Sequence, residues 1–182
     1  MGKSNLKVSA DSARRGWEEE TLFKLCVEKF KGLKCEKSST QDDRYKHIDF
    51  YIENGMSVDV KAHKKINATD KEVSQEYTWI EILNVNGNFG WVSGFATHIA
   101  YSFTTHYKLF DREKLKEFIM SRVPKHSFVY KEYNVPPTPY VVYRRGTLKD
   151  KVVLVPIKDL VDHVPYLELE RDETLLEEWR EI

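Results

Sequence analysis

The sequence predicts a mixed α/β (α+β) domain with an N-terminal helix followed by a central mixed β-sheet that is flanked by helices. The chain has 182 residues, and domains commonly contain roughly 100–200 residues. Hydrophobic residues make up 41% of the chain and aromatic residues 13%, enough to form a substantial core. Helical spacing of apolar residues near the N-terminus gives way to short alternating segments between turns. We therefore expect one domain over residues 1–182.

The first expected element is a helix that begins after Ser12, a good N-cap residue, and ends at Gly32. Leu22, Cys26 and Phe30 recur at a spacing of four residues and form one apolar stripe along it. The polar segment 34–46 lacks apolar periodicity and is expected to be a loop.

Two strands are expected next, over 47–53 and 56–62. The intervening pair Asn54-Gly55 is a strong signal for a two-residue hairpin turn. A third strand is expected over 77–85, after a polar loop. The remaining expected elements are a strand near 98–103, a helix over 111–122, strands over 128–133, 140–145 and 152–157, a helical turn over 159–164 and a terminal helix over 172–180.

The charges of the chain are unevenly distributed. There are 29 basic and 29 acidic residues, but residues 159–182 contain nine acidic and two basic side chains. The tail therefore has a net charge of −7 and the preceding body one of +7. A basic body fits a nucleic-acid partner, whereas a solvated C-terminal helix explains the same asymmetry without one.

Several classes of protein are not supported by the sequence. No apolar run approaches the roughly 18–20 residues of a membrane span, and the N-terminus lacks a signal-peptide core, so we expect a cytoplasmic protein without a membrane partner. Two cysteines, Cys26 and Cys35, form no zinc or disulfide pattern. Phosphate-binding loops, dinucleotide fingerprints and serine-hydrolase elbows are absent, so no ATP or other nucleotide cofactor is expected.

The most informative residues lie on the expected hairpin. Side chains alternate along a strand, so Asp59 and Lys61 share one face, and the hairpin would bring Asp49 near Asp59. Two carboxylates beside an ammonium group form a plausible site for Mg²⁺ or Mn²⁺. A solvated strand face with an Asp–Lys pair is the alternative interpretation.

Asp49 followed by Asp59-Val60-Lys61 on the next strand resembles the signature of the PD-(D/E)XK nuclease superfamily. Ile48 stands where this family usually has proline. Segments 77–84 and 90–101 are similar to uncharacterised, often phage-encoded, members. The resemblance covers about 12–105, which would be the catalytic core, with further strands and the acidic tail helix over 106–182. It implies a restriction-endonuclease-like fold and, for a phage-encoded member, a location in the host cytoplasm.

The resemblance also implies roles for individual residues. Asp49 and Asp59 would bind Mg²⁺ or Mn²⁺ together with the backbone carbonyl of Val60, and Lys61 would orient the attacking water. The first helix would supply a glutamate. Glu18, Glu19 and Glu20 are all available, and Glu19 is chosen because it aligns with the inward stripe and completes a Gly16-x-x-Glu19 pattern of resolvase-like members.

The implied activity is hydrolysis of DNA phosphodiester bonds by an endonuclease, which could be resolvase-like on branched DNA or of a restriction or nicking type. Small nucleases of this type often act as homodimers. The alternative is a non-catalytic nucleic-acid-binding or host-interaction module that retains the nuclease fold.

Glu81 and His63 are additional candidates, since each alternates toward the expected site. The favoured interpretations are an ordinary solvent-side glutamate for Glu81 and a structural hydrogen bond for His63. Basic residues near the site are candidates for phosphate contacts, although each alone is typical of a solvated surface; they are Arg14, Arg15, Lys64, Lys65, Arg144 and Arg145.

Overall fold

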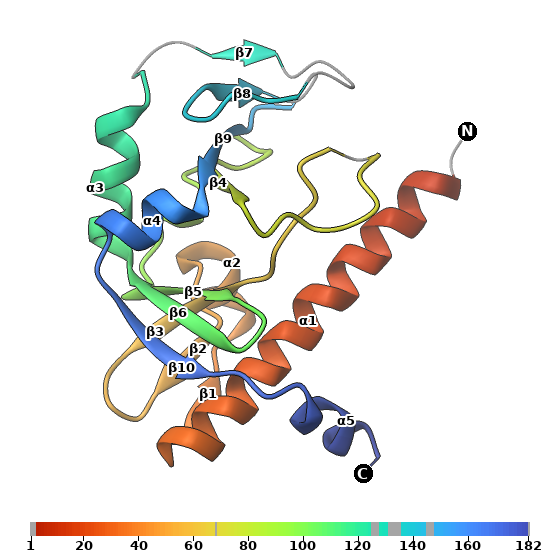
Figure 1. Ribbon diagram of the computed structural model, residues 1–182, viewed down its shortest axis with the longest axis vertical. Coiled ribbons are helices and arrows are strands. Elements are labelled where there is room, and N and C mark those ends of the chain that lie inside the picture. Colours follow the sequence, from red (N-terminus) through yellow and green to blue (C-terminus); the bar gives the residue numbers. More distant parts are fainter. Residues whose placement is uncertain (1–2, 68, 125–127, 131–135, 145–147, 182) are drawn as a thin grey trace.

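The computed structural model describes residues 3–67, 69–124, 128–130, 136–144 and 148–181, with only the backbone described for 3–12. The fold is mixed α/β, as the sequence predicts: a larger and a smaller β-sheet pack together, and a long N-terminal helix crosses the larger one (Figure 1). Within the described residues, no helix is both long and apolar enough to cross a membrane.

The larger sheet contains the expected hairpin. Its strands follow the spatial order β1 (Cys35–Lys37), β2 (Phe50–Ile52), β3 (Ser57–Lys61), β5 (His98–Ser102), β6 (His106–Asp111) and β10 (Tyr166–Glu170). Strands β2 and β3 pair antiparallel with Phe50 opposite Val58, which confirms the hairpin. The expected two-residue turn is wrong, because Ile52 pairs with Met56 and the turn therefore contains three residues, 53–55. The neighbour of β3 on its other side is β5, which runs parallel to it with Asp59 opposite Ile99.

The smaller sheet contains the strand that was expected to follow the hairpin. Its order is β4 (Tyr77–Leu83), β9 (Lys151–Pro156), β8 (Val142–Arg144) and β7 (Val129–Tyr130). The expectation of one central sheet is therefore wrong. The cause is the antiparallel pairing of β4 with β9, more than 70 residues later, in which Ile80 lies opposite Val153. No local sequence signal specifies a partner at such a distance.

The helices and the short 3₁₀ turn are α1 (Lys3–Lys31), α2 (Thr40–Lys46), η1 (Trp91–Ser93), α3 (Arg112–Arg122), α4 (Ile157–His163) and α5 (Thr174–Arg180). Helix α1 begins well before Ser12, so the expected start is wrong. The expected loop over 34–46 is also wrong, because β1 pairs with β2 and the Ser39 side chain accepts a hydrogen bond from the Asp42 amide at the start of α2. Strands β6 and β10 were not anticipated.

Two hydrophobic cores lie on opposite faces of the larger sheet. Leu22, Phe23, Cys26 and Val27 of α1 pack against one face, together with Val58 and Val60 among other sheet residues.

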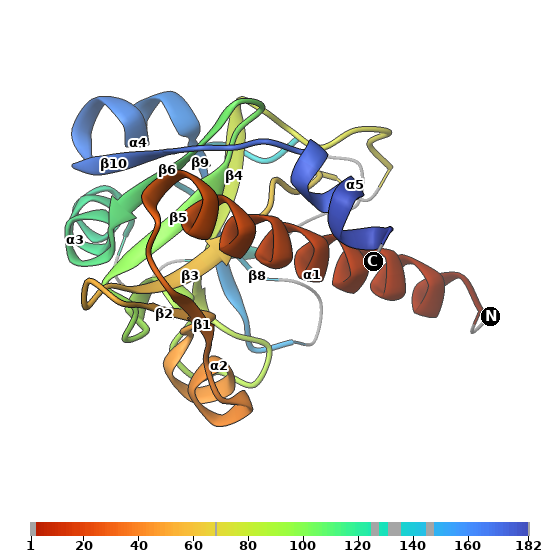
Figure 2. The same ribbon diagram turned by 90° about the horizontal axis from the view of Figure 1, so that it is seen from below.

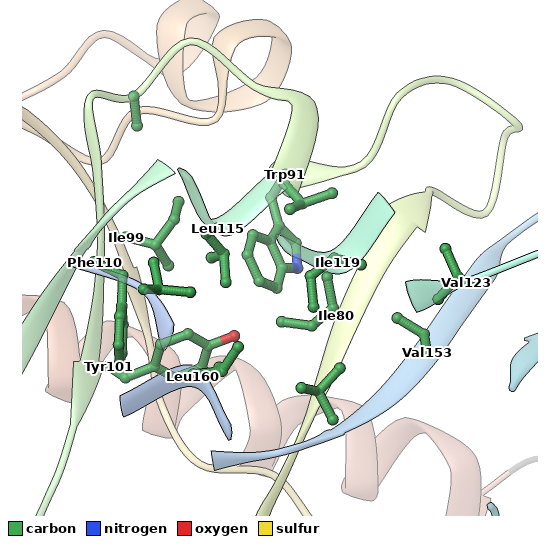
Figure 3. Packing of buried hydrophobic residues seen from close by; sticks show 14 of the residues in the cluster. Ile80, Trp91, Ile99, Tyr101, Phe110, Leu115, Ile119, Val123, Val153 and Leu160 are labelled. Atoms are coloured by element: carbon green, nitrogen blue, oxygen red, sulfur yellow. The ribbon is translucent and has the colours of Figure 1, made fainter. Parts of the chain in front are cut away.

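The second core lies between the other face, the smaller sheet and α3. It contains Trp91, Tyr101, Leu115 and Ile119, which lie close together in Figure 3. Period-2 alternation along β3 therefore points Val58 and Val60 toward α1 and Asp59 and Lys61 toward the second core.

The acidic tail is part of the fold. Strand β10 forms an edge of the larger sheet, and α5 lies along α1 (Figure 2). The two helices are joined by an edge-to-face contact between Trp17 and Trp179, with ring centroids 5.3 Å apart. Lys29 and Asp172 add an ion pair of 3.1 Å.

Candidate functional site

The hairpin brings Asp49 and Asp59 together. Phe50 pairs with Val58, and the amide of Asp49, one residue before β2, donates a hydrogen bond of 2.8 Å to the carbonyl oxygen of Val58, the neighbour of Asp59. The amide of Val60 donates a hydrogen bond of 2.7 Å to Oδ2 of Asp49, which links the first carboxylate directly to the strand that holds the second. Both aspartates are buried, with 5% of Asp49 and 2% of Asp59 exposed.

Lys61 is the immediate partner of Asp59. Its Nζ lies 2.5 Å from Oδ1 of Asp59 and 5.3 Å from the centroid of the Trp91 ring. The other oxygen of Asp59, Oδ2, is buried and has no hydrogen-bond partner among the described residues. A buried carboxylate oxygen without a donor is energetically unfavourable, and it is available to a cation or a bound water.

The pKa values of Asp59 and Lys61 are both raised. Burial raises the pKa of Asp59 to about 8; the positive charge of Lys61 opposes this rise, and the nearby carboxylate of Asp49 adds to it. Burial alone would lower the pKa of Lys61, but the negative charges of Asp59 and Asp49 outweigh it and raise that pKa. The ammonium group of Lys61 therefore stays charged beside Asp59, whose carboxyl group is harder to ionise than usual.

A second lysine, Lys37 of the edge strand β1, contacts Asp49. Nζ of Lys37 lies 3.8 Å from Oδ1 of Asp49 and also forms an ion pair with Glu20 of α1. Burial raises the pKa of Glu20, and the charge of Asp49 raises it further. Glu20 is therefore the glutamate of α1 that lies within electrostatic range of Asp49.

Glu19, the glutamate chosen from the sequence, faces a different cluster. Its carboxylate accepts hydrogen bonds from Oη of Tyr107 at 2.6 Å and from Nε of Arg171 at 3.1 Å. Glu18 pairs with Arg14 and with Arg180 of α5. Both side chains thus contact the C-terminal segment, whereas Glu20, one residue on, points toward Lys37.

Glu81 approaches the site from the smaller sheet. Its charge contributes to the raised pKa of Lys61, which places it within electrostatic range of that ammonium group. Gly90 lies directly against it, since a Cβ at this position would be only 2.2 Å from the Glu81 carbonyl oxygen. The missing side chain of Gly90 therefore allows the segment leading to Trp91 to lie against β4.

His63 lies beyond Lys61 in a separate cavity of about 470 Å³ between α1, the ends of β3 and β5, and the C-terminal segment. Arg15, Glu19, Phe103 and Arg171 also line this cavity. Burial lowers the pKa of His63, and its ring meets that of Phe103 edge-on. His63 and Arg15 thus belong to the cavity, and neither has a described contact with the aspartate pair.

The remaining basic candidates are dispersed. Lys64 and Lys65 lie three and four residues after the end of β3. Arg144 lies in the smaller sheet, where its Nε donates a hydrogen bond of 2.6 Å to the Leu148 carbonyl oxygen. Arg145 lies outside the described residues.

Sequence reasoning missed Lys37, because its strand was expected to be a loop. The contact of Trp91 with Lys61 was also missed. The only sequence signal for a strand at Lys37 was the pattern of apolar and polar residues over 35–37. Three residues are too few to distinguish a strand from a loop by this pattern.

The carboxylates of Asp49 and Asp59 are the groups best placed to bind a cation, because hard cations prefer oxygen ligands. Among the described residues, no group of three or more His, Cys, Asp and Glu side chains is arranged to hold a metal ion. Neither family models, curated proteins nor solved structures match this chain. The resemblance to the nuclease superfamily therefore depends on the residues of the site alone.

Proposed function

We propose that this protein is a metal-dependent endonuclease that hydrolyses DNA phosphodiester bonds at the Asp49–Asp59–Lys61 site. The observation that best supports this proposal is the buried Asp59 carboxylate, which has Lys61 on one oxygen and no partner for the other among the described residues. The alternative interpretation, a solvent-exposed Asp–Lys pair on a strand face, does not explain why a second carboxylate is buried beside the first.

The donor set fits a hard divalent cation. Asp49 and Asp59 would hold Mg²⁺ or Mn²⁺, with the Val60 carbonyl as a further oxygen and water completing the shell. When bound, such an ion polarises a phosphate and lowers the pKa of water. The bond from the Val60 amide holds the Asp49 carboxylate in place, so that only its remaining lone pairs are available.

Lys61 has the properties of a group that stabilises negative charge. The surrounding carboxylates keep it protonated, and its contacts with Asp59 and Trp91 restrict its position. A fixed ammonium in a buried site stabilises developing charge on a phosphate more strongly than one in water. Lys61 would also orient the attacking water. Lys37 lies between Asp49 and Glu20 and forms ion pairs with both of them.

Cleavage assays test the proposal directly. We would incubate the protein with Mg²⁺ or Mn²⁺ and labelled linear, flapped and four-way DNA, alongside Asp59→Ala and Lys61→Ala. The matched controls are Asp162→Ala and Lys158→Ala, which remove an exposed Asp–Lys pair of α4. We expect cation-dependent cutting that falls at least about 100-fold in the two site variants only.

The opposite outcomes are informative. Cutting that survives in Asp59→Ala would show that the activity resides elsewhere or in a contaminant. The absence of cutting on every substrate, with DNA binding intact, would favour a non-catalytic nucleic-acid-binding module.

A further inference from the structure

Three large aromatic side chains are exposed around the corner where α2 joins β2. Tyr45 is 68% exposed, Phe89 74% and Phe95 68%. Single exposed apolar residues are ordinary on protein surfaces, but a group of aromatic residues on one surface is typical of a binding site. We call Tyr45, Phe89 and Phe95 the aromatic corner.

Backbone contacts hold these residues near one another. The amide of Phe95 donates a hydrogen bond of 2.8 Å to the carbonyl oxygen of Lys46, the neighbour of Tyr45. A ring nitrogen of His47 lies 3.4 Å from the Phe89 carbonyl oxygen. Gly94 lies so close to this corner that a Cβ there would be 2.8 Å from the Lys46 carbonyl oxygen. The aromatic rings are thus presented by anchored backbone, which reduces the entropy lost on binding.

The chemistry around the aromatic corner suits nucleobases. Residues 82–97, which include Phe89 and Phe95, contain no charged side chain, so no carboxylate of this segment would repel a phosphate. Asn86 and Asn88 are exposed beside Phe89 and offer amide donors and acceptors. Beside Tyr45, the exposed positive charges of Arg44 and Lys46 lie close to the carboxylates of Asp42 and Asp43, and Lys46 is paired with Asp42 at 2.7 Å.

The aromatic corner is continuous with the candidate active site. Asp49 follows His47 by two residues, and Trp91, which contacts Lys61, follows Phe89 by two. Gly90, between Phe89 and Trp91, packs against Glu81. The backbone of the aromatic corner therefore runs directly into the segments that carry Asp49 and Trp91.

We propose that the aromatic corner binds unpaired nucleotides of a DNA strand by stacking of their bases. The faces of bases are available for stacking in single strands, whereas in a duplex they are covered by neighbouring base pairs. This inference rests on the proposed nuclease function and specifies its substrate class, which is DNA with a single-stranded segment next to the cleavage site.

Binding measurements without cleavage test the inference. Anisotropy titrations would use labelled oligo-dT of about 15 nucleotides, long enough for several stacked bases, and a duplex of the same length, both in EDTA. The variants are Phe89→Ala, Phe95→Ala, their double variant and Phe89→Trp. Tyr130→Ala, an exposed aromatic residue of the smaller sheet, is the matched control. Thermal melting would confirm that each variant is folded.

We expect each Phe→Ala variant to weaken oligo-dT binding about 5- to 100-fold and to change duplex binding less than about twofold, while Phe89→Trp retains binding. Equal affinity of wild type and double variant for oligo-dT, or failure of the wild type to bind it, would overturn the inference. So would conversion of a dimer to a monomer by the double variant in sedimentation, since the aromatic corner would then be an interface between copies.

The two proposals fail separately. Loss of oligo-dT binding in the phenylalanine variants without any cleavage by the wild type would overturn only the nuclease proposal. Cleavage that depends on Asp59 but not on the aromatic corner would overturn only the present one.

Discussion

The Val60 amide donates a 2.7 Å hydrogen bond to the Asp49 carboxylate, and this bond joins the beginning of β2 to the end of β3. Strand β2 begins only at Phe50, so a side chain serves here as the partner of a buried backbone amide. Asp49 therefore has a structural role in addition to the one proposed in metal binding, and the two can be separated by substitution.

Asp49→Ala is expected to destabilise the protein by about 1–3 kcal/mol, because it leaves the Val60 amide without its acceptor. Asp49→Asn retains a carbonyl oxygen and should lose less than about 1 kcal/mol, although it removes the negative charge. Urea unfolding measures both. Equal destabilisation by the two variants would show that the negative charge, and not the hydrogen bond, stabilises this corner.

Asp59 should make stability depend on pH. Its folded pKa of about 8 exceeds its unfolded value of 3.8, so the folded state binds more protons between these values. The associated stability is complete below about pH 4 and is lost as the pH rises toward 8. Asp59→Asn removes this dependence, and we expect its Tm to exceed that of the wild type by about 2–8 °C at pH 8, with a smaller difference at pH 4.

Thermal unfolding between pH 4 and pH 8 checks this expectation. Asp162→Asn, which alters an exposed aspartate of α4, is the control and should shift Tm little at any pH. A wild type whose advantage over Asp59→Asn grows as the pH rises would contradict the assigned sign.

Glu19 and Glu20 should behave in opposite ways. Glu19→Ala removes the partner of the nearly buried Arg171 and the acceptor of Tyr107, so a loss of about 2–4 kcal/mol is expected in urea unfolding. Glu20→Ala breaks a partly exposed pair with Lys37 and should lose no more than about 1 kcal/mol. If the proposed activity is observed, Glu20→Ala should reduce kcat, while Glu19→Ala should leave kcat per folded molecule unchanged.

The glycine positions provide a matched pair. A Cβ at Gly90 would meet the Glu81 backbone at 2.2 Å, so Gly90→Ala should destabilise the protein by at least about 3 kcal/mol. Gly16 lies inside α1 with nothing within 4 Å of a built Cβ, so Gly16→Ala should stabilise it by about 0.5–1 kcal/mol. Thermal melts measure both. A neutral Gly90→Ala would mean that the segment before Trp91 can move away from β4.

The hairpin could be predicted from the sequence because its determinants are local. Asn54-Gly55 predicts a turn, and the two-residue period of a strand places Asp59 and Lys61 on one face. The register was decided by the structure, in which the turn has three residues, 53–55, instead of two, and a shift of one residue would change which side chains face one another. The mixed α/β class and the position of α3 follow from similarly local patterns, including the Asp111 cap whose side chain accepts a bond from the Lys114 amide.

Only the tertiary structure determined which strands are neighbours and which glutamate meets the aspartates. The parallel pairing of β3 with β5 and the antiparallel pairing of β4 with β9 join distant segments, and such partners depend on the free energy of the whole packed core. Adjacent residues of a helix point in directions about 100° apart, so the rotation of α1 against the sheet decides between Glu19 and Glu20. That rotation is set by the packing of Leu22, Phe23 and Cys26 and by the contact of α1 with the C-terminal segment.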